Sequence, residues 1–165
     1  MTTFTMKHDL ECDEDRFWKL FFEREFNEKL FKQLQFPKFE LVEVREEEKE
    51  IIRVIKAVPK LNAPGPVQKV LGDGFGYTEE GRFDRATKVF KFVVKPNKLE
   101  GKLKNEGSVR IESTGDNKCR RIVDVVALAK VFGVGGMIEK MTEQSFRDGW
   151  GESANFINKW VKEHP

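Results

Sequence analysis

The amino-acid sequence predicts an α+β fold in which a curved antiparallel sheet of about seven strands wraps around one long C-terminal helix. Three observations lead to this expectation. The chain has 165 residues, a typical length for one domain that spans residues 1–165. Apolar and polar residues alternate over residues 3–12 and over much of residues 39–130, as they do in strands with one buried face. Residues 137–162 contain no proline and repeat apolar residues at helical spacing.

The first two elements are expected to be a strand and a helix. Asp13 can cap a helix that begins at residue 14, and neither proline nor glycine interrupts residues 14–34. We therefore predict either one helix over residues 14–34 or two helices that meet near Asn27. The inward face of strand 3–12 would carry Phe4, Met6, His8, Leu10 and Cys12.

Alternating residues and turn signals predict six more strands, at 39–46, 50–58, 74–83, 87–95, 101–114 and 119–131. The inward face of strand 101–114 would carry Leu103, Asn105, Gly107, Val109 and Ile111. In the last strand we expect Arg121, Val123, Val125 and Ala127 to face inward. A different turn length would instead turn Arg120, Ile122, Asp124 and Val126 inward, because a shift of one residue exchanges the two faces of a strand.

The C-terminal helix has small residues at the centre of its predicted inward face. That face would carry Ile138, Met141, Ser145, Gly149, Ser153, Phe156 and Trp160. Small residues can allow close packing against the sheet, or they can leave room for a ligand. Both interpretations remain open at this point.

Composition excludes several classes of protein. Thirty basic residues stand against 28 acidic ones, so the near-balanced charge of +2 does not indicate a nucleic-acid binder. No apolar run is long enough to span a membrane, and no secretory signal precedes residue 17. We therefore expect a cytoplasmic protein in which Cys12 and Cys119 are reduced thiols, close together if the first and last strands are neighbours. The two histidines and two cysteines form no metal motif, and we expect no cofactor.

Three local features resemble the START-like superfamily, which has the helix-grip fold and includes birch-pollen-allergen-like, polyketide-cyclase-like and lipid-transfer proteins. Phe17 and Trp18 lie on the first helix after an acidic cap. The segment VFGVGGMIEKMTEQSF (131–146) is similar to the family's entry into its last helix, and an aromatic segment, Phe156 to Trp160, lies near the end of that helix. The resemblance covers about residues 3–163, and it is nearest to bacterial-type members without an assigned ligand.

The resemblance implies a cavity between the sheet and the last helix that holds an apolar ligand such as a lipid, sterol or isoprenoid. The inward residues then become candidate ligand contacts, and Glu79 is a further polar candidate. Arg121 could hold a carboxylate or phosphate group. The predicted ligand-binding residues are Phe75, Tyr77, Phe90, Phe92, Leu103, Asn105, Val109, Ile111, Arg121, Val123, Ile138, Met141, Ser145 and Gly149.

The proline-rich segment 59–74 is expected to form a lid with a short helix at 66–71. Its apolar residues are Leu61, Val67, Val70 and Leu71, and Lys60 and Lys69 lie beside them. Loops longer than about 12 residues are often functional, and an apolar tip with flanking lysines could also touch a membrane transiently.

The principal functional expectation is a non-enzymatic binder or carrier of a hydrophobic small molecule, with no nucleic-acid partner and no obligate protein partner. One alternative is an enzyme of the polyketide-cyclase or hydratase kind, with His8, Tyr77, Glu79 or Arg121 as acid–base groups. Another is a co-chaperone-like module that binds proteins through the outer face of the sheet. Few polar residues are expected deep in the cavity, which favours binding over catalysis.

Overall fold

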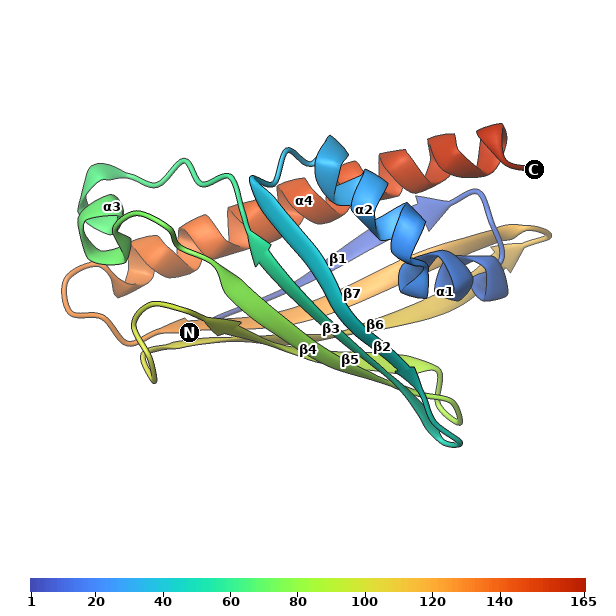
Figure 1. Cartoon of the computed structure of the whole chain (residues 1–165), viewed down its shortest axis with the longest axis horizontal. Coiled ribbons are helices and arrows are strands. Elements are labelled where there is room, and N and C mark those ends of the chain that lie inside the picture. Colours follow the sequence, from blue (N-terminus) through green and yellow to red (C-terminus); the bar gives the residue numbers. More distant parts are fainter.

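A seven-stranded antiparallel sheet with helices on one of its faces makes up the protein (Figure 1). The computed structural model describes all 165 residues. The strand order is β1-β7-β6-β5-β4-β3-β2, which confirms the predicted α+β helix-grip fold. In chain order the elements are β1 (Thr2–Leu10), α1 (Glu14–Phe22), α2 (Arg24–Gln33), β2 (Lys38–Glu46), β3 (Glu50–Val58), α3 (Gly65–Leu71), β4 (Tyr77–Asp84), β5 (Val89–Pro96), β6 (Leu103–Gly115), β7 (Lys118–Ala129) and α4 (Gly135–Glu163).

The first and last strands are neighbours. Strands β1 and β7 pair from Thr2, opposite Ala127, to Leu10, opposite Cys119. Cys12 follows β1 directly, and both thiols are buried and free. A hydrogen bond between the two thiols is the main cause that raises the pKa of Cys119 and lowers that of Cys12. The predicted proximity of the two cysteines is therefore confirmed.

The N-terminal helical segment breaks at Glu23, four residues before the predicted point. Glu23 has an extended backbone, with φ −83° and ψ 127°, and it ends α1 and precedes α2. The buried side-chain amide of Asn27 donates hydrogen bonds to the carbonyl oxygens of Phe21 (2.9 Å) and Glu23 (2.7 Å). The Glu23 carbonyl also accepts the Asn27 backbone amide at 3.1 Å, so Asn27 joins the two helices across the break rather than being the site of the break.

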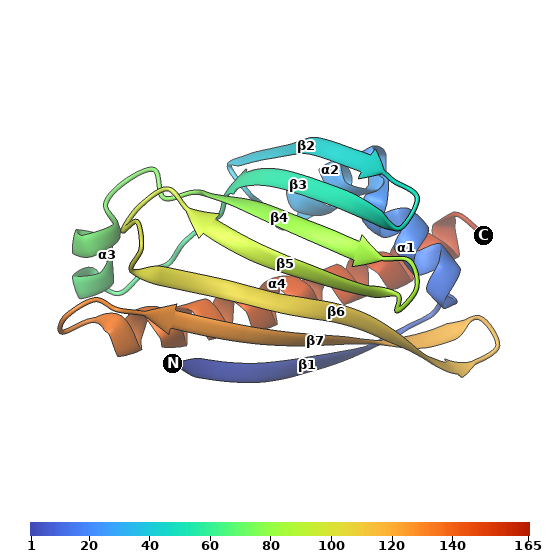
Figure 2. The same cartoon turned by 90° about the horizontal axis from the view of Figure 1, so that it is seen from below.

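Helix α4 has 29 residues and runs along the inner face of the sheet, above β1 and β7 (Figures 1 and 2). Ile138 and Ser153 of the predicted inward stripe of α4 are buried, but the stripe differs from the prediction at its centre. Phe146 and Trp150 pack against the core, whereas Ser145 is exposed. Phe156 and Trp160 lie beside Phe26 of α2, with ring centroids 5.5 and 5.4 Å away. The correction arises because α4 covers one edge of the sheet and not its middle.

Two glycines make room for aromatic rings in the middle of the sheet. A Cβ atom added to Gly81 would overlap the ring of Phe90, and one added to Gly107 would lie 2.7 Å from the ring of Phe92. Phe90 and Phe92 are 0% and 2% exposed. Gly107 therefore permits the close approach of the Phe92 ring to β6.

We predict that Gly81→Ala lowers the free energy of unfolding by about 2–3 kcal/mol, because the added methyl group overpacks a filled core. Chemical denaturation measures the change. Gly151→Ala is the matched control, because no atom outside the local helix backbone lies within 4 Å of a Cβ added there. This control should be neutral or stabilising by up to about 1 kcal/mol, since alanine favours helices. Equal losses in both variants would contradict the overpacking account.

Candidate functional site

The inward-facing side chains of the sheet fall into two separate hydrophobic clusters. We call the larger one, around α1 and the middle of the sheet, the main cluster. It contains 22 buried residues, including the predicted ligand contacts Phe90, Phe92, Val109 and Val123. The smaller one, beneath α3, we call the α3 cluster. Its four buried members are Val67, Leu71, Ala129 and Ile138.

Aromatic contacts fill the main cluster. The ring of Phe21 in α1 lies 4.8 Å from that of Phe90, and Trp18 lies 4.5 Å from Phe83. On the α4 side, Phe92 stacks at 6.3 Å on Phe146. The predicted contacts in this part of the sheet are therefore packed against the protein's own side chains.

The α3 cluster is less completely enclosed. Val67 and Leu71 of α3 are 0% and 2% exposed and point toward the sheet, as expected for a lid. Val70 remains half-buried. Partly buried apolar side chains surround these four residues. They come from the predicted lid, from two predicted strands and from the C-terminal helix, and they include Leu61, Phe75, Leu103 and Met141.

Polar side chains also lie on the inner face of the sheet. Glu79 pairs with Val94 across β4 and β5, and Val94 pairs with Asn105 of β6. Tyr77 lies one inward position further along β4. The Tyr77 hydroxyl and the Asn105 amide make no hydrogen bond within the protein, and neither residue is completely buried. These groups are therefore free to bind water or a ligand.

Arg53 of β3 forms a buried ion pair with Glu79. Arg53 Nη2 lies 3.1 Å from Glu79 Oε1, and Nη1 donates to the carbonyl oxygen of Phe21 at 3.0 Å. The guanidinium also covers the ring of Phe21 at 3.7 Å. Burial lowers the pKa of Arg53, and the charge of Glu79 opposes that shift. Sequence reasoning missed Arg53, although it occupies the same face of its strand as Ile51 and Ile55.

Tyr77 is held in its neutral form. Burial is the main cause that raises the pKa of its hydroxyl above the ordinary value, and the negative charge of Glu79 adds to the shift. A phenol with a raised pKa is a poor general base near neutral pH, but it can donate a hydrogen bond.

Arg121 fastens β7 to α4 without an acidic partner. Its Nη2 donates to the carbonyl oxygen of Trp150 at 2.7 Å and to Ser153 Oγ at 3.0 Å, while Nε has no partner. Burial lowers the pKa of Arg121 to about 9. These contacts resolve which face of β7 points inward: it is the face of Arg121, Val123, Val125 and Ala127.

His8 of β1 lies beside Arg121, with His8 Nδ1 3.2 Å from Arg121 Nη2. Burial, followed by the charge of Arg121, lowers the pKa of His8 to about 4. The imidazole is therefore neutral near pH 7, and Nδ1 can accept a hydrogen bond from the arginine.

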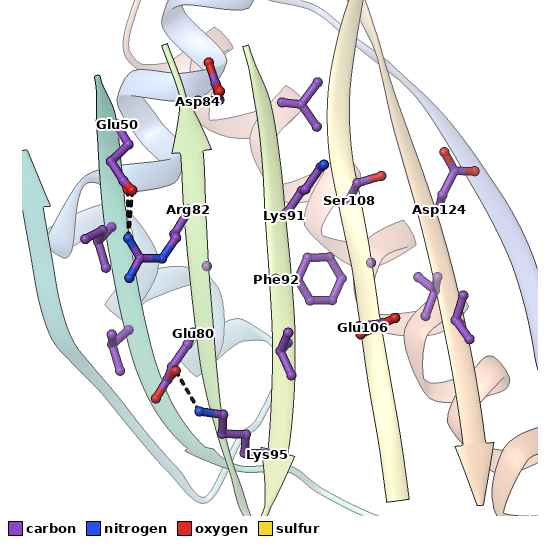
Figure 3. A pocket seen from close by; sticks show the side chains of 18 of the residues that line it. Glu50, Glu80, Arg82, Asp84, Lys91, Phe92, Lys95, Glu106, Ser108 and Asp124 are labelled. Carbon is purple, nitrogen blue, oxygen red and sulfur yellow. Dashed lines mark hydrogen bonds and ion pairs between the residues drawn. The ribbon is translucent and has the colours of Figure 1, made fainter. Parts of the chain in front are cut away.

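A groove lies on the opposite, outer face of the sheet and does not match the predicted site. This groove has a volume of about 1310 Å³. Ion pairs cross it, including Arg82 with Glu50 at 2.7 Å and Lys95 with Glu80 at 2.8 Å (Figure 3). A groove in which charged and polar residues outnumber apolar ones does not suit an apolar ligand.

We predict that Glu79→Ala lowers the free energy of unfolding by about 3–5 kcal/mol, because Arg53 would keep a buried charge without a partner. Urea denaturation measures the loss. Glu80→Ala is the control, because Glu80 is the next residue of β4 but pairs with Lys95 on the exposed face. Its loss should stay below about 1 kcal/mol. A similar loss in both variants would refute a special role for the buried pair.

The lowered pKa of His8 predicts a pH-dependent stability. Between the ordinary value of 6.5 and about 4, the unfolded chain binds a proton that the folded chain does not. The free energy of unfolding should therefore fall as pH decreases through this window, by about 1–2 kcal/mol at a position that solvent partly reaches. Denaturation of wild type and of His8→Gln across the window is the test, and an unchanged pH slope in the variant would oppose it.

No helix of the protein is both long enough and apolar enough to cross a bilayer.

No curated protein sequence matches the chain. Solved structures share its fold over nearly its whole length. The Zhui aromatase/cyclase from a Streptomyces species has 12% sequence identity and a TM-score of 0.64, with 98% of this chain and 93% of that chain covered.

Two further solved structures support the same architecture. Norcoclaurine synthase from Thalictrum flavum, which has also been solved in complex with dopamine and hydroxybenzaldehyde, has 16% identity and a TM-score of 0.65, with 99% of this chain and 87% of that chain covered. A START superfamily protein from Mycobacterium smegmatis has 10% identity and a TM-score of 0.59, with 99% of each chain covered. Identities this low establish a START-like fold alone. The family model described as "Protein of unknown function (DUF2505)" matches residues 5–161, and the chain therefore belongs to the DUF2505 family.

Proposed function

We propose that this protein binds a hydrophobic small molecule between α3, α4 and the part of the sheet that carries Tyr77 and Asn105. One observation carries the proposal: Tyr77 and Asn105 lie on the inner face of the sheet, are only partly buried and make no hydrogen bond within the protein, and partly buried apolar side chains surround the nearby α3 cluster. Interior polar groups are normally hydrogen-bonded, so these two leave room for a partner such as water or a ligand.

The apolar wall of the proposed site comes from the α3 cluster. Leu103, Phe75 and Met141 face the interior but are only partly buried. Covering apolar surface that water can reach is favourable, so an apolar ligand gains free energy by packing there. Val67 and Leu71 would close over it from α3. Gly149 and Arg121 lie further along α4 and β7 and remain predicted contacts, whereas the exposed Ser145 does not.

The polar groups indicate what kind of ligand fits. Tyr77 can donate a hydrogen bond, and the Asn105 amide can both donate and accept. A mainly apolar molecule with one hydroxyl or carbonyl group, as in a sterol, an isoprenoid alcohol or a lipid, would satisfy both the wall and these groups. The norcoclaurine synthase complex supports the idea that a fold of this kind can accommodate small ring compounds.

The same groups favour binding over catalysis. The raised pKa of Tyr77 opposes its use as a base, and Glu79 is engaged by Arg53. His8, the other candidate base, lies beside Arg121, which is joined to the far part of α4. No pair of free acid–base groups therefore converges on one point of the proposed site.

Titration with the neutral apolar dye N-phenyl-1-naphthylamine tests the proposal, together with native mass spectrometry of protein purified without detergent. We expect saturable binding of one dye molecule, and we expect Asn105→Phe to weaken it by about tenfold or more because the new ring fills the space beside the α3 cluster. Circular dichroism of the variant verifies its folding.

Val93→Phe is the matched control. Val93 lies one residue before Val94 in the neighbouring strand, but it faces the outer groove and is 41% exposed. This variant should bind the dye like the wild type. Loss of binding in Val93→Phe but not in Asn105→Phe would assign the ligand to the outer groove, and absence of saturable binding in the wild type would also reject the proposed site.

A further inference from the structure

One end of the molecule combines exposed apolar side chains with unpaired lysines. Phe132, in the loop between β7 and α4, is 104% exposed and contacts no other aromatic ring. Met137, at the start of α4, is 40% exposed. One exposed apolar residue needs no partner by itself, but Phe132 and Met137 lie on one short segment that also carries Lys130 and Lys140, and this combination suits a partner.

The loop that carries Phe132 is anchored. Val131 and Val134, on either side, pack against the α3 cluster. The amide of Gly135 donates to the carbonyl oxygen of Val131 at 2.8 Å, and Gly133 turns the chain with φ +80°. These contacts hold the backbone in a tight turn while the Phe132 side chain projects away from the protein.

Three segments meet at this end, which we call the basic end: residues 59–76, 96–102 and 130–140 (left side of Figures 1 and 2). Each segment contributes apolar residues to the α3 cluster. The amide of Lys130 donates to the carbonyl oxygen of Lys102 at 2.8 Å, which joins two of the segments directly.

The charge of the basic end differs from that of the whole chain. The chain holds 30 basic and 28 acidic residues, but the three segments contain six lysines and only three acids. One of the acids, Glu139, is 8% exposed and is engaged by the amino group of Met1 at 3.0 Å. No ion pair involves any of the six lysines, which are Lys60, Lys69, Lys98, Lys102, Lys130 and Lys140.

We propose that the basic end docks on the surface of an anionic lipid membrane, with Phe132 and Met137 entering the headgroup region. Apolar side chains flanked by lysines suit such a surface, where each lysine adds electrostatic attraction. The expected contact through segment 59–74 stays a prediction: Val67 and Leu71 of that segment point inward, and we place the exposed anchor in the neighbouring loop. The docking surface uses outward-facing side chains of segments whose inward-facing side chains line the proposed ligand site, so docking would bring α3 against the lipid.

Sedimentation with vesicles tests the docking. Wild-type protein should bind vesicles of phosphatidylcholine mixed with phosphatidylglycerol, bind weakly to pure phosphatidylcholine, and dissociate as sodium chloride is added. Phe132→Ser should weaken binding by about tenfold or more, because it removes the apolar anchor. The side chain makes no packing contact, so thermal unfolding should not change.

Two control variants distinguish vesicle binding through this surface from nonspecific vesicle binding. Val93→Ser removes an exposed apolar residue from the outer face of the sheet and should bind normally. Lys130→Glu should weaken binding to the anionic vesicles, whereas Lys19→Glu, an equal charge change in α1, should not. Equal binding by the wild type and Phe132→Ser, equal effects of the two lysine variants, or no preference for the anionic vesicles would overturn the proposal.

The outcomes also separate docking from the proposed ligand site. Asn105→Phe should lose the dye but keep its vesicle binding, and Phe132→Ser should show the reverse. If Phe132 instead covers a second copy of this chain, analytical ultracentrifugation would detect a wild-type dimer that Phe132→Ser dissociates, which would count against a membrane partner.

Discussion

The pairing of β1 with β7 is the constraint on which the rest of the structure depends. It joins the beginning of the chain to the last strand before α4, with Leu10 opposite Cys119 and His8 opposite Arg121. Arg121 then binds the carbonyl oxygen of Trp150 and the hydroxyl of Ser153, so the same strand pair fixes the path of α4. At the other end of this pair, Thr2 Oγ1 donates to Glu139 Oε1 at 2.8 Å. Because α4 is held at both ends over β1 and β7, the middle of the sheet must be covered by something else.

Different helices cover the two halves of the remaining inner face of the sheet. Over one half, α1 supplies Phe17, Trp18 and Phe21, whose rings meet those from β4 and β5 in a dense cluster. Over the other half there is only the short helix α3, which has seven residues. The excess of phenylalanine in the composition is therefore concentrated where α1 lies. The region under α3 has smaller side chains and unpartnered polar groups, and this contrast is the physical basis for placing a ligand there.

Charged residues, like apolar ones, are distributed unevenly over the molecule. Over most of the molecule, neighbouring strands and helix turns pair acids with bases on the exposed face, as Arg82 does with Glu50. Such exposed pairs add little stability, but they leave little unbalanced charge. The lysines of the basic end have no such partners, and they surround an exposed phenylalanine. The overall charge of +2 does not reveal this difference, because composition counts charged residues without regard to where folding places them.

The sequence by itself determined the elements and their class. Alternation placed Tyr77, Asn105 and Arg121 on inward faces, because a strand has a period of two wherever it lies. Only the tertiary structure decided which partners those faces meet. The helix break moved to Glu23 because Asn27 could reach the carbonyl groups around it, and Ser145 of α4 became exposed because the helix lies over the sheet edge. Arg53 found Glu79 across a strand pair, and Phe132 was left in solvent by a turn whose flanking valines are buried. Periodicity describes one element at a time, whereas these contacts depend on distances between elements far apart in the chain.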